Sequence, residues 1–271
     1  MRILHVGDMS GVASITANMC SKLGHPSVVI LDDKTDIWNH GKYYNNTADC
    51  SSTEVMIKVI KGSLDRYDHI VYHDRYNVAA ELDHLQVPSS FIFHGNMLRQ
   101  EPDIYTHVSN LTSIENIFVS SEDLLKYAPE ATVFRRPIDL DLFHIDENKV
   151  RSDMAVCLTQ ARYLEQVRHI TADVEHDVIP IDRSIETLEY KEMPILLNSL
   201  KFYYDIKFQP THPPTLLGLT NDMVVPELSM TGLQALACGV QVWSNGIWFY
   251  KFPMEYSDEN ACKEFISVLE A

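Results

Sequence analysis

Two histidines, each at the end of a short apolar run, have the greatest chemical potential in this sequence. His73 begins the triplet His-Asp-Arg75, and His94 is followed by Gly95. A histidine in such a place can form a hydrogen bond with a hydroxyl group or transfer a proton near neutral pH. Gly95 opens the backbone beside His94. The chain has twelve histidines, so a structural role is the alternative for each of these two.

A glycine-containing turn, Gly7-Asp-Met-Ser-Gly11, lies between the first apolar run and a helical pattern. Glycine lets the backbone turn tightly and approach a ligand, and the N-terminus of a helix attracts anions. The turn lacks the GxGxxG pattern of dinucleotide-binding proteins. We therefore expect either a phosphate loop or a plain strand-to-helix turn.

Residues 227–243, ELSMTGLQALACGVQVW, combine a polar start with an apolar helical pattern and a strand-like end. Glu227 and Thr231 lie near the expected helix start, where unpaired N–H groups and the positive end of the dipole favour anions. Gln234 lies about one turn further along. This pattern predicts a site for the diphosphate and sugar of a nucleotide, and a buried helix with a polar cap is the alternative.

Two arginines, Arg162 and Arg168, follow the first strand expected in the second half of the chain. The guanidinium group is a rigid, permanently charged fork that suits a diphosphate. Solvated surface arginines are the alternative.

Strand-like and helix-like stretches alternate along the chain, which predicts βαβ units and mainly parallel sheets. In the first half we expect strands at 3–6, 27–31, 69–72, 91–93, 116–119 and 132–134, and helices at 12–23 and 121–126. In the second half we expect strands at 154–158, 177–181, 202–204 and 240–243, and helices at 192–200, 231–237 and 258–269. Ligands of such sheets bind beyond the carboxyl ends of the strands, where the histidines lie.

A polar, proline-marked segment at 136–153 divides the two series and predicts an interdomain linker. We expect an N-terminal Rossmann-like domain at 1–145 and a second one at 146–255, facing each other across a cleft. Residues 256–271 are expected to form a helix that packs back toward the first domain.

Composition places the chain among ordinary globular proteins, with 45% hydrophobic and 22% charged residues. No apolar run reaches the ~18 residues that a membrane span requires. The start, MRILHVGDMSG, lacks a basic leader and is expected to be a first strand, not a signal peptide.

The net charge of −16 argues against a nucleic-acid partner, because such proteins normally present a basic face. The five cysteines are odd in number and show no CxxC spacing. We therefore expect no disulfide framework, no structural metal site and a reducing, cytoplasmic compartment.

Three segments together resemble the GT-B glycosyltransferases, in particular the large retaining family 4 of nucleotide-sugar transferases. They are VGDMSGVASITANMCSKLGHPSVVI, the run from IFHGN to FRRPIDLDLF, and MTGLQALACGVQVW. The histidine-glycine element, the "P-I-D-x-x-x-F" linker and the helix similar to "EAxAxGxPV" occur in the family's order. The resemblance covers most of residues 1–145 and is patchy over 150–225.

The sequence departs from the family pattern at several donor-site positions. Gln234 stands where the family has the carboxylate that usually binds ribose, and Pro226 where it has the first carboxylate, with Glu227 one place off. Ala161-Arg162 replaces a glycine-arginine pair, and Arg168 stands near the place of a lysine.

The resemblance implies a sugar transferase that needs no metal and no cofactor. Its first domain would bind an acceptor, which is a glycan, lipid or protein, through His94 and the loops with Gly7, Gly11, His73, Arg75 and Gly95. Its second domain would bind a UDP- or GDP-sugar, and the reaction would retain the anomeric configuration.

Two other functions stay open. The missing carboxylates agree with a degenerate relative that binds a nucleotide sugar without turnover. A short-chain NAD(P) dehydrogenase is the other, since Gly7-x-x-x-Gly11-x-Ala13 is similar to its cofactor loop and Tyr203-x-x-x-Lys207 to its catalytic pair. That pair requires a helix, whereas KFYYDIKF alternates like a strand.

Overall fold

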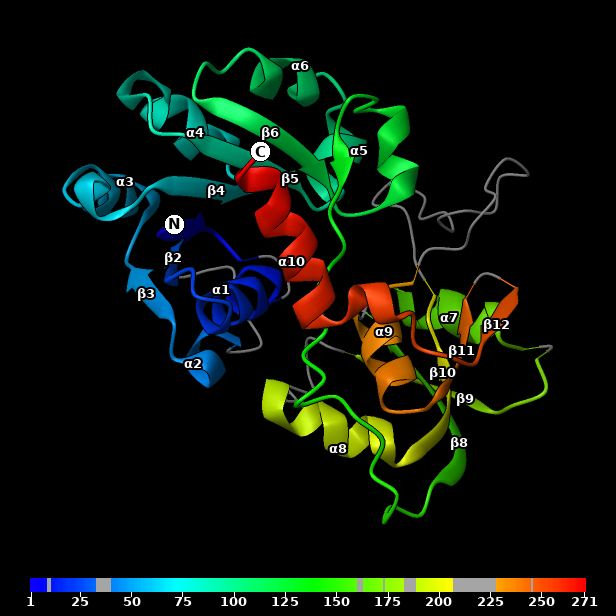
Figure 1. The fold of residues 1–271 in the computed structure, drawn as a ribbon. Coiled ribbons are helices and arrows are strands. Elements are labelled where there is room, and N and C mark those ends of the chain that lie inside the picture. The colour runs from blue at the N-terminus through cyan, green and yellow to red at the C-terminus, as the bar shows by residue number, and fades with distance from the viewer. Residues whose placement is uncertain are drawn as a thin grey trace. The chain divides into compact units, whose positions relative to one another are not determined.

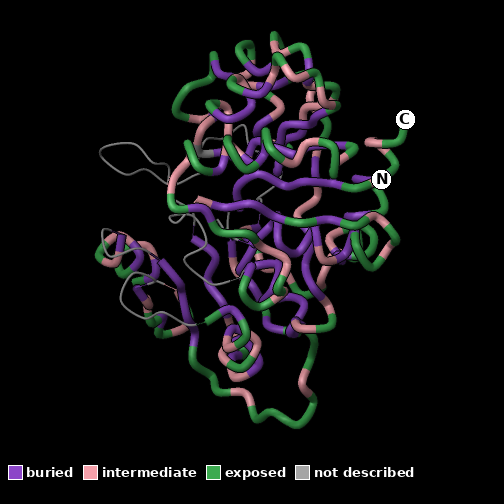
Figure 2. Tube along the Cα trace, turned by 90° about the vertical axis from the view of Figure 1, so that its left-hand side faces the viewer, coloured by how far each residue is buried: buried purple, intermediate pink, exposed green. Residues whose placement is uncertain are grey.

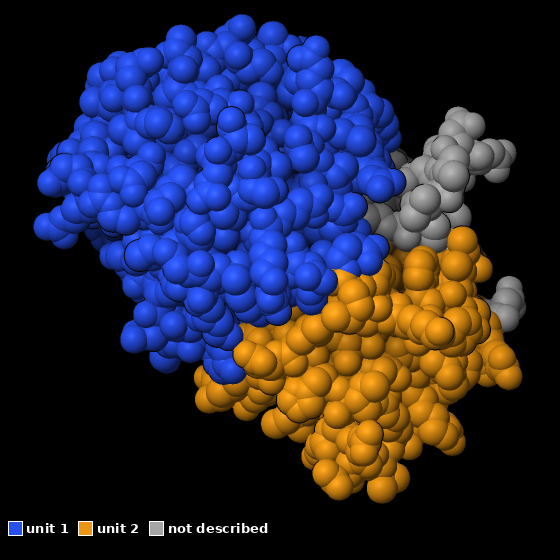
Figure 3. Space-filling model, viewed as in Figure 1, with its two compact units in different colours: residues 1–137, 255–271 blue, residues 138–254 orange. Residues whose placement is uncertain are grey.

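The chain of 271 residues folds, in a computed structural model, into two compact units (Figures 1 and 3). The described residues are 1–8, 11–32, 40–159, 163–172, 174–182, 189–206, 228–244 and 246–271. Unit 1 comprises residues 1–137 and 255–271, and unit 2 comprises residues 138–254. Each unit contains its own sheet, so the expected mixed α/β fold is confirmed at that level.

Unit 1 is built on a seven-stranded sheet whose strand order is β3-β2-β1-β4-β5-β6-β7 among the described residues. All of its neighbouring strands are parallel. The strands are β1 (Ile3–Val6), β2 (Ser27–Asp32), β3 (Thr47–Cys50), β4 (His69–His73), β5 (Ser89–Phe93), β6 (Ile114–Val119) and β7 (Thr132–Val133). The strand order reverses between β1 and β4, and open α/β sheets bind ligands at such a switch point.

The helices of unit 1 connect these strands. They are α1 (Val12–Lys22), α2 (His40–Tyr44), α3 (Thr53–Lys61), α4 (Tyr76–Leu82), α5 (Asn96–Gln100), α6 (Ile104–Ser109) and α10 (Asp258–Leu269), with the 3-10 turns η1 (Leu64–Arg66), η2 (Asp83–Leu85) and η3 (Glu122–Lys126). Serine side chains cap two of them: Ser52 accepts a hydrogen bond from the N–H of Val55, and Ser257 accepts one from the N–H of Asn260.

Residues Glu122–Lys126 form the 3-10 turn η3, where the sequence predicted a short helix at 121–126. The Ser121 hydroxyl makes no capping bond to a backbone N–H, and it donates to Oδ1 of Asp123 at 2.7 Å.

The described residues of unit 2 form a five-stranded sheet in the order β12-β11-β10-β8-β9. Its strands are β8 (Ser152–Thr159), β9 (Val178–Asp182), β10 (Leu200–Tyr204), β11 (Gln241–Ser244) and β12 (Ile247–Phe249). Its helices are α7 (Leu164–Ile170), α8 (Met193–Asn198) and α9 (Met230–Ala237), with the 3-10 turn η5 (Tyr190–Glu192); η6 (Met254–Tyr256) leads back to unit 1. The antiparallel strand β12 was not expected from the sequence.

Apolar strands fill the centre of each unit, as the buried tube segments in Figure 2 show. In unit 1, the last helix, α10, is in contact with α1. Its Phe265 is 2% exposed and lies against the rings of His5, Phe118 and Phe134. The final twelve-residue helix is therefore part of the core of unit 1.

Candidate functional site at the carboxyl edge of the unit 1 sheet

Polar residues follow β1, β4 and β5 at their carboxyl ends. Because these strands are parallel neighbours, their ends lie at one edge of the sheet. At this edge lie all six residues that the sequence predicted for the first domain. They are Gly7, Gly11, His73, Arg75, His94 and Gly95.

The glycine turn is explained by contacts within the protein. Gly7 has φ +82°, and a Cβ atom placed on it would lie 2.8 Å from Nε of Arg75. The buried carboxylate of Asp8 accepts hydrogen bonds from the N–H groups of Ala13 and Ser14 at the start of α1. An anion of the protein itself thus already occupies the helix start where a phosphate was one expectation.

Arg75, which follows β4, forms an ion pair with Asp32 at the end of β2, two strands away in the sheet. Its guanidinium group donates to Asp32 at 2.6 and 3.3 Å, and Thr53 donates to the same carboxylate at 2.7 Å. The positive charge of Arg75 is therefore largely balanced before any ligand binds.

Three histidines form a hydrogen-bonded chain across β1, β4 and the end of β5. Nδ1 of His5 lies 3.1 Å from Nε2 of His73, and Nδ1 of His73 lies 3.0 Å from Nε2 of His94. Burial lowers the pKa of His5 to about 3 and that of His94 to about 3, the latter with a contribution from Arg136. Burial also holds the pKa of His73 well below its usual value, so all three rings are neutral near pH 7.

Neutral rings in this chain must share one tautomer. Each neutral ring carries one proton, and each of the two ring-to-ring hydrogen bonds contains one. If Nδ1 of His73 is protonated, Nδ1 of His5 and Nδ1 of His94 must be protonated as well. The opposite arrangement places all three protons on Nε2. His94 is the partly exposed end of the chain, and at its other end Nε2 of His5 is buried without a partner among the described residues. His94 therefore acts as a neutral hydrogen-bonding group and is a poor general base near pH 7.

The low pKa values of these histidines lead us to expect that the protein loses stability in acid. Because the pKa values are lower in the folded protein than the ordinary 6.5, the unfolded chain binds more protons below pH 6.5, and stability falls as the pH falls toward 3. We expect His94→Gln to reduce this slope by up to about 1.4 kcal/mol per pH unit between pH 4 and 6. Urea denaturation at a series of pH values measures the slope. The exposed His144→Gln is the matched control, and an unchanged slope in His94→Gln would show that His94 is protonated in the folded protein.

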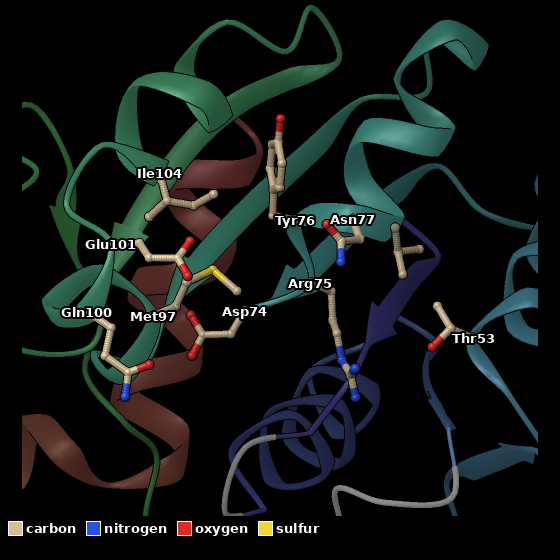
Figure 4. Close-up of a pocket in the computed structure, with 10 residues that line it drawn as sticks. Thr53, Asp74, Arg75, Tyr76, Asn77, Met97, Gln100, Glu101 and Ile104 are labelled. Carbon is tan, nitrogen blue, oxygen red and sulfur yellow. The ribbon is translucent and has the colours of Figure 1, made fainter. Parts of the chain in front are cut away.

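A cavity of about 440 Å³ lies beside this edge, between the end of β4, helices α4 to α6 and Thr53 at the start of α3 (Figure 4). Asp74 and Arg75 line it, with Met97, Gln100 and Glu101 of the α5 region. Asp74 is the residue that the sequence analysis did not select. Its backbone is in the left-handed region, at φ +53°, which is uncommon for any residue except glycine.

The carboxyl group of Asp74, at this edge of the sheet, has a pKa close to neutral pH. Oδ1 accepts a hydrogen bond from the backbone N–H of His94 at 3.1 Å, and Oδ2 is buried without a partner among the described residues. Burial raises the pKa of Asp74 to about 7, against the opposing effects of the His94 N–H and the Arg75 charge. Such a pKa suits a group that exchanges protons near pH 7. Its place directly after β4, between two selected residues, was the available sequence signal.

In unit 2, the start of α9 is held by Asp205, which follows β10. Oδ2 of Asp205 accepts the N–H of Ser229 at 2.5 Å, and the Ser229 hydroxyl accepts the N–H of Gly232. Thr231 and Gln234 lie on this helix and are 8% and 4% exposed. These contacts agree with a buried helix that has a polar cap, which was one of the two expectations.

Of the remaining residues predicted for a donor site, Arg168 is the one that belongs to the described residues. Arg168 lies on α7, where its exposed side chain pairs with Glu165 at 2.5 Å. Arg162 and Glu227 lie outside the described residues, as does Lys207. Tyr203 is buried in strand β10.

Two features are absent from the described ranges. No group of three or more His, Cys, Asp or Glu side chains there could hold a metal ion. Among those same residues, no helix has both the length and the apolar character to cross a membrane.

No protein-family model matches this chain, and no curated protein sequence matches it significantly.

Proposed function

We propose that this chain is a metal-independent glycosyltransferase of the GT-B type, which moves a sugar from a nucleoside-diphosphate donor to a hydroxyl acceptor. Its strongest support is the organisation of the chain. A seven-stranded parallel sheet is followed by a second α/β unit, and the last helix returns to the first unit. This order agrees with the resemblance in the linker PIDLDLF and in the helix-strand segment that contains α9.

In this proposal unit 1 binds the acceptor at the carboxyl edge of its sheet, and unit 2 binds a UDP- or GDP-sugar. The neutral ring of His94 forms a hydrogen bond with the reacting groups, because its low pKa makes it a weak base. On the donor side, Thr231 and Gln234 contact the ribose and phosphates, together with Arg162, Arg168 and Glu227. The guanidinium groups stabilise the charge that develops on the leaving diphosphate.

A reducing, cytoplasmic compartment belongs to the same proposal. All five cysteines are buried, and none forms a disulfide.

A second candidate is a relative that binds a nucleotide sugar and does not transfer it. The neutral amide of Gln234 in place of a carboxylate favours this alternative. The carboxylate of Asp205 against the start of α9 repels a diphosphate at that helix end and therefore counts against both candidates. The dehydrogenase hypothesis has less support, since a strand does not supply the helical spacing that its tyrosine and lysine need.

The deciding experiment measures binding and turnover separately. We expect calorimetry with UDP and GDP to show binding, and incubation with UDP- and GDP-sugars to release nucleotide in the presence of an acceptor or by slow hydrolysis. Binding without release would support the second candidate, and no binding of either nucleotide would contradict both.

His94 provides a further prediction for the same assay. We expect His94→Ala to lower turnover by about tenfold, the upper range for one neutral hydrogen bond, and to leave UDP or GDP affinity nearly unchanged. An equal loss of both, or loss of the circular dichroism spectrum, would show that His94 has a structural role only.

A further inference from the structure

The first and last helices of unit 1 lie side by side. Helices α1 and α10 are in contact although they lie near opposite ends of the chain (Figure 1). On the two helices, Sγ of Cys262 lies 3.9 Å from the carbonyl oxygen of Thr16. Just beyond both helices, Nδ1 of His25 lies 3.8 Å from Oε1 of Glu270. The two contacts follow in the same direction along both segments, so α1 and α10 run parallel.

A pair of thiols is buried in this contact. Cys20 follows Thr16 by one helical turn, so both residues lie on the face of α1 that meets α10. Burial and a hydrogen bond with the Cys20 thiol raise the pKa of the Cys262 thiol well above its usual value. Both side chains are 0% exposed. The two sulfur atoms are therefore neighbours in the interior of unit 1, and they come from separate helices.

Two opposed thiols can be joined by a disulfide, or they can hold a metal ion together with further ligands. A disulfide requires side chains that point toward each other, because cysteines with divergent side chains cannot be bridged without moving the backbone. The hydrogen bond between the two thiols meets this condition. A structural zinc site needs several ligands, and the described residues contain no group of three or more His, Cys, Asp or Glu that could hold a metal ion. Oxidation to a disulfide is therefore the chemistry that this pair favours.

We propose that Cys20 and Cys262 form a reversible disulfide when the protein meets an oxidising thiol couple such as glutathione, and that this bond fastens α10 to α1. One cysteine attacks glutathione disulfide as a thiolate and forms a mixed disulfide, which releases one molecule of glutathione. The other cysteine then attacks the mixed disulfide at the sulfur of the first and releases a second molecule of glutathione. Two cysteine thiols are thus oxidised to one disulfide, glutathione disulfide is reduced to two molecules of glutathione, and the thiol protons pass to them. This inference does not depend on the proposed sugar transfer.

Access to the thiols controls how fast the bond forms. The attacking group must be a thiolate that reaches the reagent, and Cys262 has neither property while α10 is docked. Glutathione disulfide must therefore reach the pair during a transient detachment of α10. We expect oxidation to be slow in buffer alone and to accelerate several-fold in urea below the unfolding transition, where such local openings are more frequent.

The bond would close most of the chain into one loop. All of unit 2 lies between residues 20 and 262 in the sequence. A disulfide that closes a long loop restricts the unfolded chain and so stabilises the folded state. We expect the oxidised protein to unfold at a urea concentration higher by about 1 M or more than the reduced protein.

The direct test uses the whole wild-type chain in a series of glutathione buffers with an increasing oxidised fraction. Free thiols are then blocked by alkylation, and the protein is digested with trypsin without reduction. Trypsin releases the peptide 3–22, whose one cysteine is Cys20, and the peptide 252–263, whose one cysteine is Cys262. We expect mass spectrometry to find these two peptides joined by a disulfide, at oxidised fractions where the remaining cysteines are still alkylated.

Variants separate this bond from a general effect of oxidation. Cys262→Ala is expected to lose the joined peptides and the difference in urea midpoint between oxidising and reducing buffers. Cys157→Ala, which removes a buried cysteine of unit 2, is the matched control and should keep both. If Cys262→Ala does not fold, the peptides of the wild-type protein still decide the question.

Three results would each overturn the proposal. They are the absence of joined peptides at every glutathione ratio, stable mixed disulfides with glutathione in their place, and a joined protein that unfolds at the same or a lower urea concentration than the reduced one.

Discussion

Phe265→Ala is expected to lower the free energy of unfolding of unit 1 by about 3–5 kcal/mol, the usual cost of removing a buried phenylalanine. The side chain of Phe265 is 2% exposed and touches the rings of Phe118 and Phe134, which lie on and next to the sheet. Truncation leaves a cavity between α10 and the sheet, which the strands are too rigid to fill. Urea denaturation followed by circular dichroism measures the loss.

Hydrogen exchange measured peptide by peptide shows where the stability is lost. We expect faster exchange in β1, β4 and β5 of unit 1, and unchanged exchange in β8 and β10 of unit 2, because each unit has its own core. Lys263→Ala, on the exposed face of the same helix, is the control and should change stability by less than ~0.5 kcal/mol. A loss below about 1 kcal/mol for Phe265→Ala would contradict an anchoring role for α10.

Asp205→Asn is expected to tighten the binding of UDP or GDP by about 20- to 100-fold if the start of α9 receives the diphosphate. The present carboxylate lies 2.5 Å from the N–H of Ser229 and faces the backbone of Gly232. Two like charges ~5 Å apart repel by roughly 3 kcal/mol at an effective dielectric constant near 20, and solvent reduces this value. Asparagine keeps an acceptor for the Ser229 N–H, so the cap of α9 should remain.

Isothermal titration of both forms with each nucleotide measures the change. Asp153→Asn removes an exposed carboxylate at the amino end of β8, the opposite edge of the sheet, and should leave the affinity unchanged. Unchanged affinity in Asp205→Asn would show that the diphosphate does not bind at α9. The donor site would then have to be sought elsewhere in unit 2.

Local composition accounts for the elements that the sequence predicted well. The strand Ile3–Val6 is apolar and buried at every position, and α10 begins after a capping serine with two acidic residues in its first turn. The edge strand β3 was missed because its sequence, TADC, is short and half exposed. The antiparallel β12 was missed because the sequence pattern favoured parallel strands only.

The sequence by itself determined that this protein alternates strands and helices in two sheets, and that histidines, an arginine and glycines follow the strands of the first. Those features depend on neighbouring residues, so they are visible in the linear pattern. Only the tertiary structure decided which of these side chains meet. Strand order and register place residues about 20 to 70 positions apart within 3.5 Å of one another, as in the His5–His73–His94 chain and the Arg75–Asp32 pair. They also leave one oxygen of Asp74 without a partner among the described residues. Burial then sets the charge of each group, which makes His94 neutral and brings the pKa of Asp74 to about 7.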